Sequence, residues 1–318
     1  MSLNRPIWKL RDWIDKDKLN WTILSRNKNA VDLLKENLEK INWYNLSLNK
    51  NAIEILEKYR DNINWFNLSE NKYAIKLLKE NYEKINWKLI SNNKNAIMLI
   101  KEQLNNRNIN WTYLSYNKNA IEIFKANMDK INWNILSYNK NAIDLLKENP
   151  EKINWENLSE NENAIDLLKA NPEKIEWCYI SLNPNAIKLL EENIDKIDWY
   201  YLSENPNAIH LLEANPDKIN WDNLSKNKNA IHLLEANLNK INWNYLSENP
   251  NAIHILKANP EKINWNKLSG NPSIFELDYE KMKDNNQEMY EDLIKEVMKP
   301  LRVFKNLDYD YLEELFGD

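Results

Sequence analysis

One short motif, Trp-x-x-(Leu/Ile)-Ser-x-Asn, recurs through most of this chain and limits its possible folds more than any other feature. Neighbouring copies lie 22 residues apart, except for one spacing of 24, where two extra residues fall in the segment QLNNRNIN. The copies begin at Trp21, Trp43, Trp65, Trp87, Trp111, Trp133, Trp155, Trp177, Trp199, Trp221, Trp243 and Trp265. A fixed period of this length is typical of solenoids, in which each repeat is one supersecondary unit that packs against its neighbours.

The segment NAIxLL of each repeat predicts a first helix, because its apolar residues recur at the spacing of one helical face. In the repeat that begins at Trp199, Asn205 is expected to cap the start of this helix, with Pro206 in its first turn. The helix should be about ten residues long and stop near Asn215, where asparagine takes the left-handed conformation and Pro216 prevents continuation. Since the chain has only two glycines, asparagine is expected to turn the corners.

The segment around each motif tryptophan predicts a second, shorter helix. Asn220, with Asp198 and Glu176 as its equivalents, stands at the N-cap, and Ile219 and Leu224 have the spacing of a hydrophobic staple. Helices this short are marginal in isolation, so packing between repeats must stabilise them. The tryptophans are expected to be buried between successive repeats, where replacement by alanine costs about 3 to 5 kcal/mol.

These patterns predict an all-α fold, an α-solenoid of stacked short helix hairpins with about eleven complete 22-residue repeats and a cap at each end. Stacked at about 8 to 10 Å per repeat, the solenoid would be roughly 100 Å long. A leucine-rich repeat has a similar period, but its further apolar columns hold polar residues such as Lys88 and Glu156 here. We expect an N-terminal cap at 1–20, the solenoid at 21–269 and a helical C-terminal cap at 270–318.

The repeats are followed by NPSIFELDY at 271–279 and by a basic, proline-containing segment at 299–304. Together they resemble the short, Trp- and Asn-rich helical repeat proteins of giant DNA viruses, although Lys299-Pro300 stands where His-Pro is more usual. The resemblance implies a viral origin and a place in the host cytoplasm, the virus factory or the virion. It implies no particular biochemical activity.

Composition restricts the function classes. The 43 basic and 48 acidic residues nearly cancel, so no strong overall field attracts nucleic acid or a membrane. The single cysteine, Cys178, excludes an internal disulfide framework and a multi-cysteine metal site, and it fits a reducing compartment. No apolar run reaches signal-peptide or membrane-span length. We expect a soluble, intracellular protein with no membrane partner, for which a nucleic-acid partner is the less favoured choice.

No catalytic constellation emerges from the sequence. It has no glycine-rich phosphate loop and no HExxH, and a serine present in twelve repeats is better explained by hydrogen bonding than by nucleophilic attack. We therefore expect no catalytic residue, no cofactor and no enzymatic activity.

The three histidines of the chain, His210, His232 and His254, occupy one position in three consecutive repeats. At about 8 to 10 Å per repeat, the outer two lie nearly 20 Å apart, whereas zinc needs nitrogen ligands at about 2 Å. We expect no metal site, and keep the histidines as candidate partner contacts.

A lysine column also recurs, at Lys40, Lys84, Lys130, Lys152, Lys174, Lys196, Lys218, Lys240 and Lys262. It could follow a phosphate backbone. Acidic residues stand beside nearly all of these lysines, so solvated ion-pair ladders are the favoured interpretation.

Two positions vary between repeats: the second after each tryptophan and the residue after Leu-Ser. Exposed aromatic side chains there favour a protein-binding surface, although packing between repeats explains them equally well. The candidates are Tyr113, Tyr116, Tyr138, Tyr179, Tyr201 and Tyr245, and the first three form the densest group. The sequence thus predicts a non-enzymatic interaction scaffold for a viral or host protein. The alternatives are a nucleic-acid-associated protein that uses the lysine column and a structural component of the virion.

Overall fold

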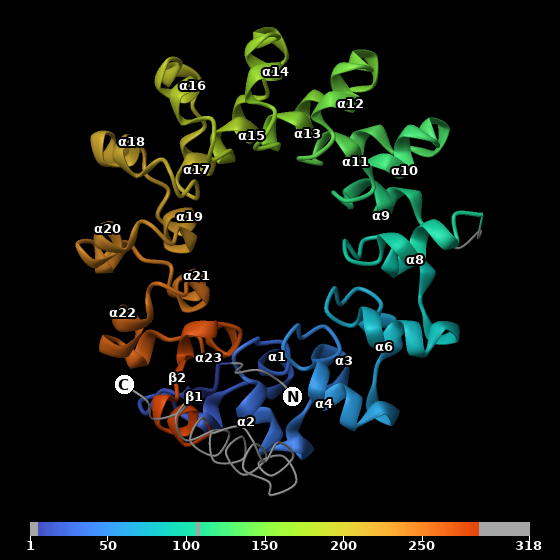
Figure 1. Cartoon of the computed structure of the whole chain (residues 1–318). Helices are drawn as coiled ribbons and strands as arrows, with labels where there is room; N and C mark the ends of the chain where they lie inside the picture. The colour runs from blue at the N-terminus through green and yellow to red at the C-terminus, as the bar shows by residue number, and fades with distance from the viewer. Residues whose placement is uncertain (1–5, 106–108, 286–318) are drawn as a thin grey trace, which may run out of the picture. The chain divides into compact units, whose positions relative to one another are not determined.

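The computed structural model, which describes residues 6–105 and 109–285, confirms an all-α solenoid with two short helices in almost every repeat. One helix of each repeat begins at the motif tryptophan, and the helix predicted from NAIxLL begins ten residues later. Among the repeats that Figure 1 labels, the tryptophan helices lie nearer the centre and the others lie outside them, so we call them inner and outer helices.

The inner helices are α1 (Trp21–Leu24), α3 (Trp43–Leu46), α5 (Trp65–Leu68), α7 (Trp87–Ile90), α9 (Trp111–Tyr116), α11 (Trp133–Ser137), α13 (Trp155–Glu160), α15 (Trp177–Leu182), α17 (Trp199–Leu202), α19 (Trp221–Lys226), α21 (Trp243–Glu248) and α23 (Trp265–Leu268). The outer helices are α2 (Val31–Lys35), α4 (Ile53–Lys58), α6 (Ile75–Glu80), α8 (Ile97–Glu102), α10 (Ile121–Lys125), α12 (Ile143–Lys147), α14 (Ile165–Lys169), α16 (Ile187–Glu191), α18 (Ile209–Ala214), α20 (Ile231–Glu235) and α22 (Ile253–Ala258).

A short 3-10 helix follows most outer helices and leads into the next repeat. These segments are η2 (Leu38–Lys40), η3 (Arg60–Asn62), η4 (Tyr82–Lys84), η5 (Met128–Lys130), η6 (Pro150–Lys152), η7 (Pro172–Lys174), η8 (Ile194–Lys196), η9 (Pro216–Lys218), η10 (Leu238–Lys240) and η11 (Pro260–Lys262). Two more, η1 (Lys16–Lys18) and η12 (Pro272–Ile274), flank the repeats. In each repeat the core comes from the same few positions, as shown by Leu202, Ala208 and Leu212, which are fully buried.

The predicted N-cap of the inner helix is confirmed. The Asn220 side chain accepts the Asn223 N–H, and Asp198 accepts the Tyr201 N–H in the same way. Glu176 stands at the equivalent place without a side-chain cap bond, because its longer side chain suits this geometry less well than asparagine or aspartate.

The predicted start of the outer helix is wrong. Helix α18 begins at Ile209 with Ala208 as its N-cap residue, so it is six residues long. Asn205 does not cap it, because the Asn205 Oδ1 accepts the Asn207 N–H at 3.0 Å and closes a tight turn before the helix.

The predicted end of the outer helix is confirmed at Asn215, but its left-handed conformation is not. Asn215 has φ −135° and ψ 61°, and its side-chain amide donates to the Leu211 carbonyl at 2.9 Å. Asparagine thus ends the helix by satisfying two free carbonyls, that of Leu211 with its side chain and that of Leu212 with its backbone N–H, without taking the left-handed conformation.

The tryptophans are less buried than predicted. All twelve motif tryptophans are half-buried, because a lysine side chain, and not the next repeat, covers the outer face of several rings. The fully buried residues of the motif are its leucine or isoleucine and its serine.

Buried serines tie each repeat to the next. The Ser203 Oγ donates to the Trp199 carbonyl at 2.7 Å and accepts the Asn220 N–H at 2.9 Å, so it links its own helix to the start of the following inner helix. The same pair of bonds recurs at all twelve motif serines. This confirms a hydrogen-bonding explanation for the serine.

The last asparagine of the motif forms what we call the asparagine ladder. Asn205 is fully buried, and its Nδ2 donates to the Ser181 carbonyl at 2.9 Å and to the Asn183 carbonyl at 3.0 Å in the preceding repeat. Every member donates to the serine carbonyl one repeat earlier. The members are Asn27, Asn49, Asn71, Asn93, Asn117, Asn139, Asn161, Asn183, Asn205, Asn227, Asn249 and Asn271.

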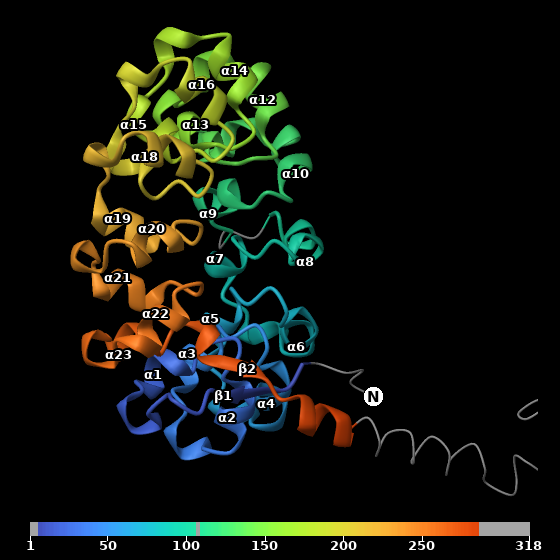
Figure 2. The ribbon, with the colours of Figure 1, turned by 90° about the vertical axis from the view of Figure 1, so that its left-hand side faces the viewer.

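Residues Leu10–Phe275 form one compact unit, and the ladder closes within it. Asn27 of the first repeat donates to the carbonyls of Ser269 and Asn271 in the last repeat, both at 3.1 Å. The Asn20 N–H donates to the Ser269 Oγ at 2.8 Å, which is the bond that links neighbouring repeats elsewhere. Helices α1 and α23 lie side by side in both views (Figures 1 and 2). The repeats therefore form a closed ring, whereas the sequence predicted an open solenoid roughly 100 Å long with a cap at each end.

The other compact unit comprises 1–9 and 276–318, of which 6–9 and 276–285 are described. The Asp278 N–H donates to the Ile7 carbonyl at 2.9 Å, and Lys9 lies 4.0 Å from Glu276. Strands β1 (Trp8–Leu10) and β2 (Phe275–Leu277) pair in a two-stranded sheet that the sequence did not predict. The two helices predicted for the C-terminal cap lie outside the described residues.

Candidate functional site

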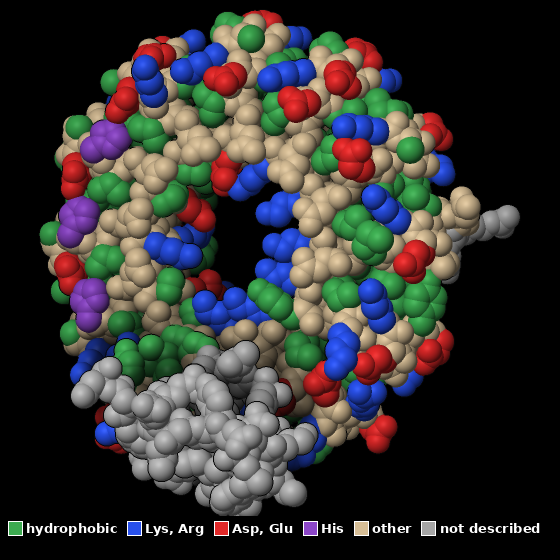
Figure 3. Space-filling model, viewed as in Figure 1, with side chains coloured by type: hydrophobic (Ala, Val, Ile, Leu, Met, Phe, Trp, Pro, Cys, Tyr) green, Lys and Arg blue, Asp and Glu red, His purple; other side chains and the backbone are tan. Residues whose placement is uncertain are grey.

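The ring is open at its centre, and Figure 3 shows basic side chains gathered along one side of the opening. We call the surface that faces this opening the inner wall. Its side chains come from the inner helices and the turns that follow them, and several of their positions vary between repeats. The recurring serines and the asparagines of the ladder join the repeats, so the hydrogen bonds of that frame do not depend on these variable side chains.

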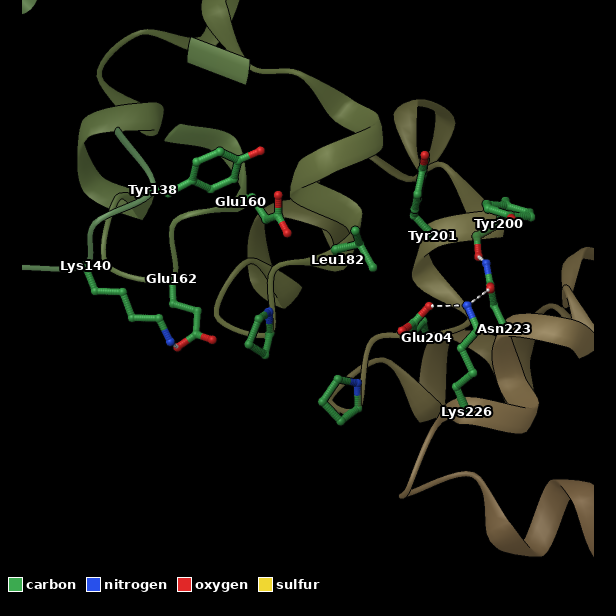
Figure 4. A pocket seen from close by; sticks show the side chains of 12 residues that line it. Tyr138, Lys140, Glu160, Glu162, Leu182, Tyr200, Tyr201, Glu204, Asn223 and Lys226 are labelled. Carbon is green, nitrogen blue, oxygen red and sulfur yellow. Dashed lines mark hydrogen bonds and ion pairs between the residues drawn. The ribbon is translucent and has the colours of Figure 1, made fainter. Parts of the chain in front are cut away.

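A hollow of about 630 Å³ lies on the inner wall, across five consecutive repeats (Figure 4). The residues that line it are Tyr138, Lys140, Glu160, Glu162, Leu182, Pro184, Tyr200, Tyr201, Glu204, Pro206, Asn223 and Lys226. They combine apolar and aromatic surface with both signs of charge. This mixture is typical of surfaces that bind proteins.

Of the six candidate tyrosines, two line the hollow and two more stack against those. Tyr138 stacks on Tyr116 with ring centroids 6.4 Å apart, and Tyr201 stacks on Tyr179 at 6.3 Å. Each stack joins equivalent positions of neighbouring repeats, so the rings pack between repeats and also present an edge to the hollow.

The other two candidate tyrosines lie beneath lysines. Tyr113 is covered by Lys88 at 5.7 Å and Tyr245 by Lys226 at 4.7 Å, measured from Nζ to the ring centroid. The predicted group of Tyr113, Tyr116 and Tyr138 is therefore brought together only in part: a stacked pair with Tyr113 beside its own lysine.

Carboxylates of the inner wall hold tyrosine hydroxyls. A hydrogen bond to Glu156, together with the negative charge of that carboxylate, raises the pKa of Tyr179 to about 12. Burial raises the pKa of Tyr138, and the charge of Glu160 raises it further. Both phenols therefore stay protonated at neutral pH and act as hydrogen-bond donors.

Ion pairs stand at both ends of the hollow. Lys140 pairs with Glu162, and Lys226 pairs with Glu204 at 3.0 Å while donating to the Asn223 Oδ1 at 2.8 Å (Figure 4). Glu204 stands directly after Leu-Ser, at one of the two variable positions that the sequence pointed to. Lys140 and Glu162 were not predicted, because they lie two residues after that position in their own repeats, yet they line the same hollow.

The three histidines do not belong to the inner wall. They lie in outer helices and appear on the outer margin in Figure 3. Each Nε2 contacts a glutamate of the preceding repeat: His210 to Glu191 at 2.8 Å, His232 to Glu213 at 2.7 Å and His254 to Glu235 at 2.5 Å. Their exposure leaves them open to a partner, but they lie in the outer helices, away from the inner wall.

The lysine column does not form the predicted ion-pair ladder. Seven of its nine members place the ammonium group 4.6–4.9 Å from the ring centroid of a motif tryptophan instead, at Lys40, Lys84, Lys130, Lys196, Lys218, Lys240 and Lys262. In the described part of the chain, none of the nine has an ion pair with the acidic residue beside it. The half-exposed indole offers a closer and larger contact than a solvated neighbouring carboxylate.

A search of residues 6–105 and 109–285 for three or more metal-ligating side chains in one group found none. The same residues contain no helix that is both long and apolar enough to span a membrane. Comparisons with protein-family models, with curated proteins and with solved structures found no match to this chain.

Proposed function

We propose that this chain is a non-enzymatic interaction scaffold that binds a protein partner in the hollow of its inner wall. One observation carries the proposal: the variable side chains of five consecutive repeats converge on one hollow, while an invariant hydrogen-bonded frame holds the repeats in register. Because the serine and asparagine-ladder hydrogen bonds between repeats do not involve the side chains of the hollow, those side chains can differ from repeat to repeat and match a partner.

The lining fits an extended peptide segment with an apolar residue flanked by basic ones. Leu182, Pro184 and Pro206 supply apolar contact, and the exposed ring of Tyr200 supplies an aromatic face. The Glu160 carboxylate, held in the wall beside Tyr138, and the Glu204 carboxylate offer charge to a basic residue. Aromatic residues in such positions commonly dominate binding energy.

The test is site-specific photo-crosslinking in cells that produce the protein. A benzophenone amino acid at Tyr200, inside the hollow, should cross-link one stoichiometric protein, and the product should disappear when Leu182→Asp is added. The same probe at Met98 in outer helix α8, which is 64% exposed, is the matched control. Equal products from both sites, or none from Tyr200, would contradict the proposal.

The resemblance to giant-virus repeat proteins extends the proposal to a viral protein that acts inside the host cell, on a viral or host partner. A structural role in the virion is a separate candidate, and a mass-spectrometric census of purified particles tests it directly.

A further inference from the structure

The inner wall differs in charge between two runs of five repeats. We compare the first and second residues after each motif tryptophan and the first and third after each motif serine. In the repeats from Trp21 to Trp111, these positions hold Arg26, Lys28, Lys50, Lys72, Lys88, Lys94 and Lys118 against one carboxylate, Glu70. In the repeats from Trp133 to Trp221, they hold Lys140, Lys226 and Lys228 against Glu156, Glu160, Glu162, Glu204 and Asp222. We call the first run the basic sector. The nearly neutral composition of the whole chain hides it.

Repeat equivalence places these lysines on the inner wall. Pro184 and Pro206 line the hollow, and the residues at their position in the first five repeats are Lys28, Lys50, Lys72, Lys94 and Lys118. None of these five has an ion pair within residues 6–105 and 109–285.

The lysines are close enough to repel one another. The charge of Lys72, followed by that of Lys118, lowers the pKa of Lys94. Equivalent inner-wall side chains of neighbouring repeats can lie close together, as the stacked tyrosines show with ring centroids 6.3–6.4 Å apart, and charges at such a spacing are only partly screened by salt, whose Debye length is about 8 Å. A row of unpaired, mutually repelling cations binds an anion that neutralises several of them at once.

Exposed aromatic rings accompany the lysines. Tyr200 lines the hollow, and its equivalents in the basic sector are Tyr44 and Phe66, which are 54% and 53% exposed. Tyr73 is 50% exposed beneath the Lys72 ammonium, at 4.9 Å from Nζ to the ring centroid. Exposed flat faces and cations therefore occur in the same repeats.

We call the five lysines at the position of Pro184 the lysine row. We propose that the basic sector binds single-stranded nucleic acid, with phosphates on this lysine row and bases stacked on Tyr44, Phe66 and Tyr73. Proteins that bind single strands without sequence preference combine these two features. An acidic peptide would neutralise the lysines equally well but would leave the flat aromatic faces uncovered. The inference is independent of the protein-binding hollow, which lies in other repeats.

The experiment measures binding of the full chain to a fluorescein-labelled oligothymidylate by fluorescence anisotropy, between about 50 and 200 mM salt. Lys72→Ser/Lys94→Ser should weaken binding and lower the slope of log affinity against log salt by about 1.4, since each neutralised phosphate contributes about 0.7. The control, Lys79→Ser/Lys101→Ser, removes the same charge from outer helices α6 and α8 and should leave both quantities unchanged.

Stacking is tested separately. Phe66→Ala should weaken binding by about 5-fold to 150-fold, the usual range for one stacked base, and Phe66→Tyr should restore it. Circular dichroism confirms that each variant is folded. Absence of binding at low salt, equal loss in both lysine pairs, or a polyglutamate peptide that binds as tightly as the oligonucleotide and is unaffected by Phe66→Ala would each overturn the proposal.

Discussion

Closure of the asparagine ladder can be tested with one substitution, Asn27→Ala. In the closed ring, the Asn27 amide donates to the Ser269 and Asn271 carbonyls, and its Oδ1 accepts the Asn29 N–H at 3.1 Å. In an open solenoid only the last of these bonds would exist, because the first repeat would have no preceding neighbour. The cost of the substitution therefore reports on closure.

The magnitude follows from the bonds that are lost. Three hydrogen bonds at about 0.5 to 1.5 kcal/mol each give about 1.5 to 4.5 kcal/mol, and the upper part of this range applies because the carbonyls left behind are buried. Asn27 is 4% exposed and Asn205 is fully buried, with the same three bonds. Asn27→Ala and Asn205→Ala should thus lower the free energy of unfolding by equal amounts, within about 0.5 kcal/mol.

Urea unfolding followed by tryptophan fluorescence measures this cost, with circular dichroism as a second probe of whether unfolding is cooperative. The matched control is Asn251→Ala. It removes an exposed hydrogen bond from the Asn251 side chain to the Lys228 carbonyl and keeps the bond that the Asn251 N–H donates to Asn249. Its cost should be about 0.5 to 1.5 kcal/mol. If Asn27→Ala costs no more than Asn251→Ala while Asn205→Ala costs much more, the ring is not closed.

Four further outcomes are expected. Trp221→Ala should cost about 2 to 3 kcal/mol in thermal unfolding, less than a fully buried tryptophan, because the ring is half-buried; a cost of about 5 kcal/mol would contradict this. Ser225→Ala should cost about 1 to 3 kcal/mol, since it leaves the Asn242 N–H without its acceptor, whereas Ser225→Cys should cost less if a weak acceptor suffices. His232→Ala should change the stability by less than about 1 kcal/mol, because its pair with Glu213 is exposed, and calorimetric titration of the wild type with zinc should show no heat. Tyr179 should ionise near pH 12 in absorbance titration, and Glu156→Gln should move its midpoint towards 10. Because the pKa of Tyr179 is raised in the folded protein, the stability that this hydrogen bond contributes is present below about pH 10 and is lost as the pH rises through 12.

The repeat period and the order of apolar residues were sufficient to predict the fold class and the inner-helix caps. Both depend on contacts within one repeat, for instance between Asn220 and the backbone three residues on. The role of Asn205 could not be read in the same way. An N-cap asparagine and a ladder asparagine are identical in a single repeat, and only the neighbouring carbonyls at Ser181 and Asn183 decide between them.

Ring closure could not be predicted from the sequence for a related reason. It depends on a small rotation between repeats that accumulates to a full turn, and no single residue encodes that rotation. The inner wall was predicted in part, since variation singled out Tyr138 and Tyr201, which line the hollow although they are half-buried. The lysine row was not predicted because, within one repeat, its position looks like an ordinary solvated surface position. The row forms only when the lysines of neighbouring repeats come close enough to affect one another.

A ring that closes through the same hydrogen bonds that join its other repeats has a fixed number of repeats. An open solenoid can gain or lose a 22-residue copy at either end and keep every remaining contact, because each repeat contacts only its neighbours. Here a lost copy would separate Asn27 from Ser269 unless every other junction rotated further to compensate. The two extra residues before Trp111 show the kind of change that such a ring tolerates: the spacing between two motifs increases, while Asn117 keeps its bond to the Ser91 carbonyl.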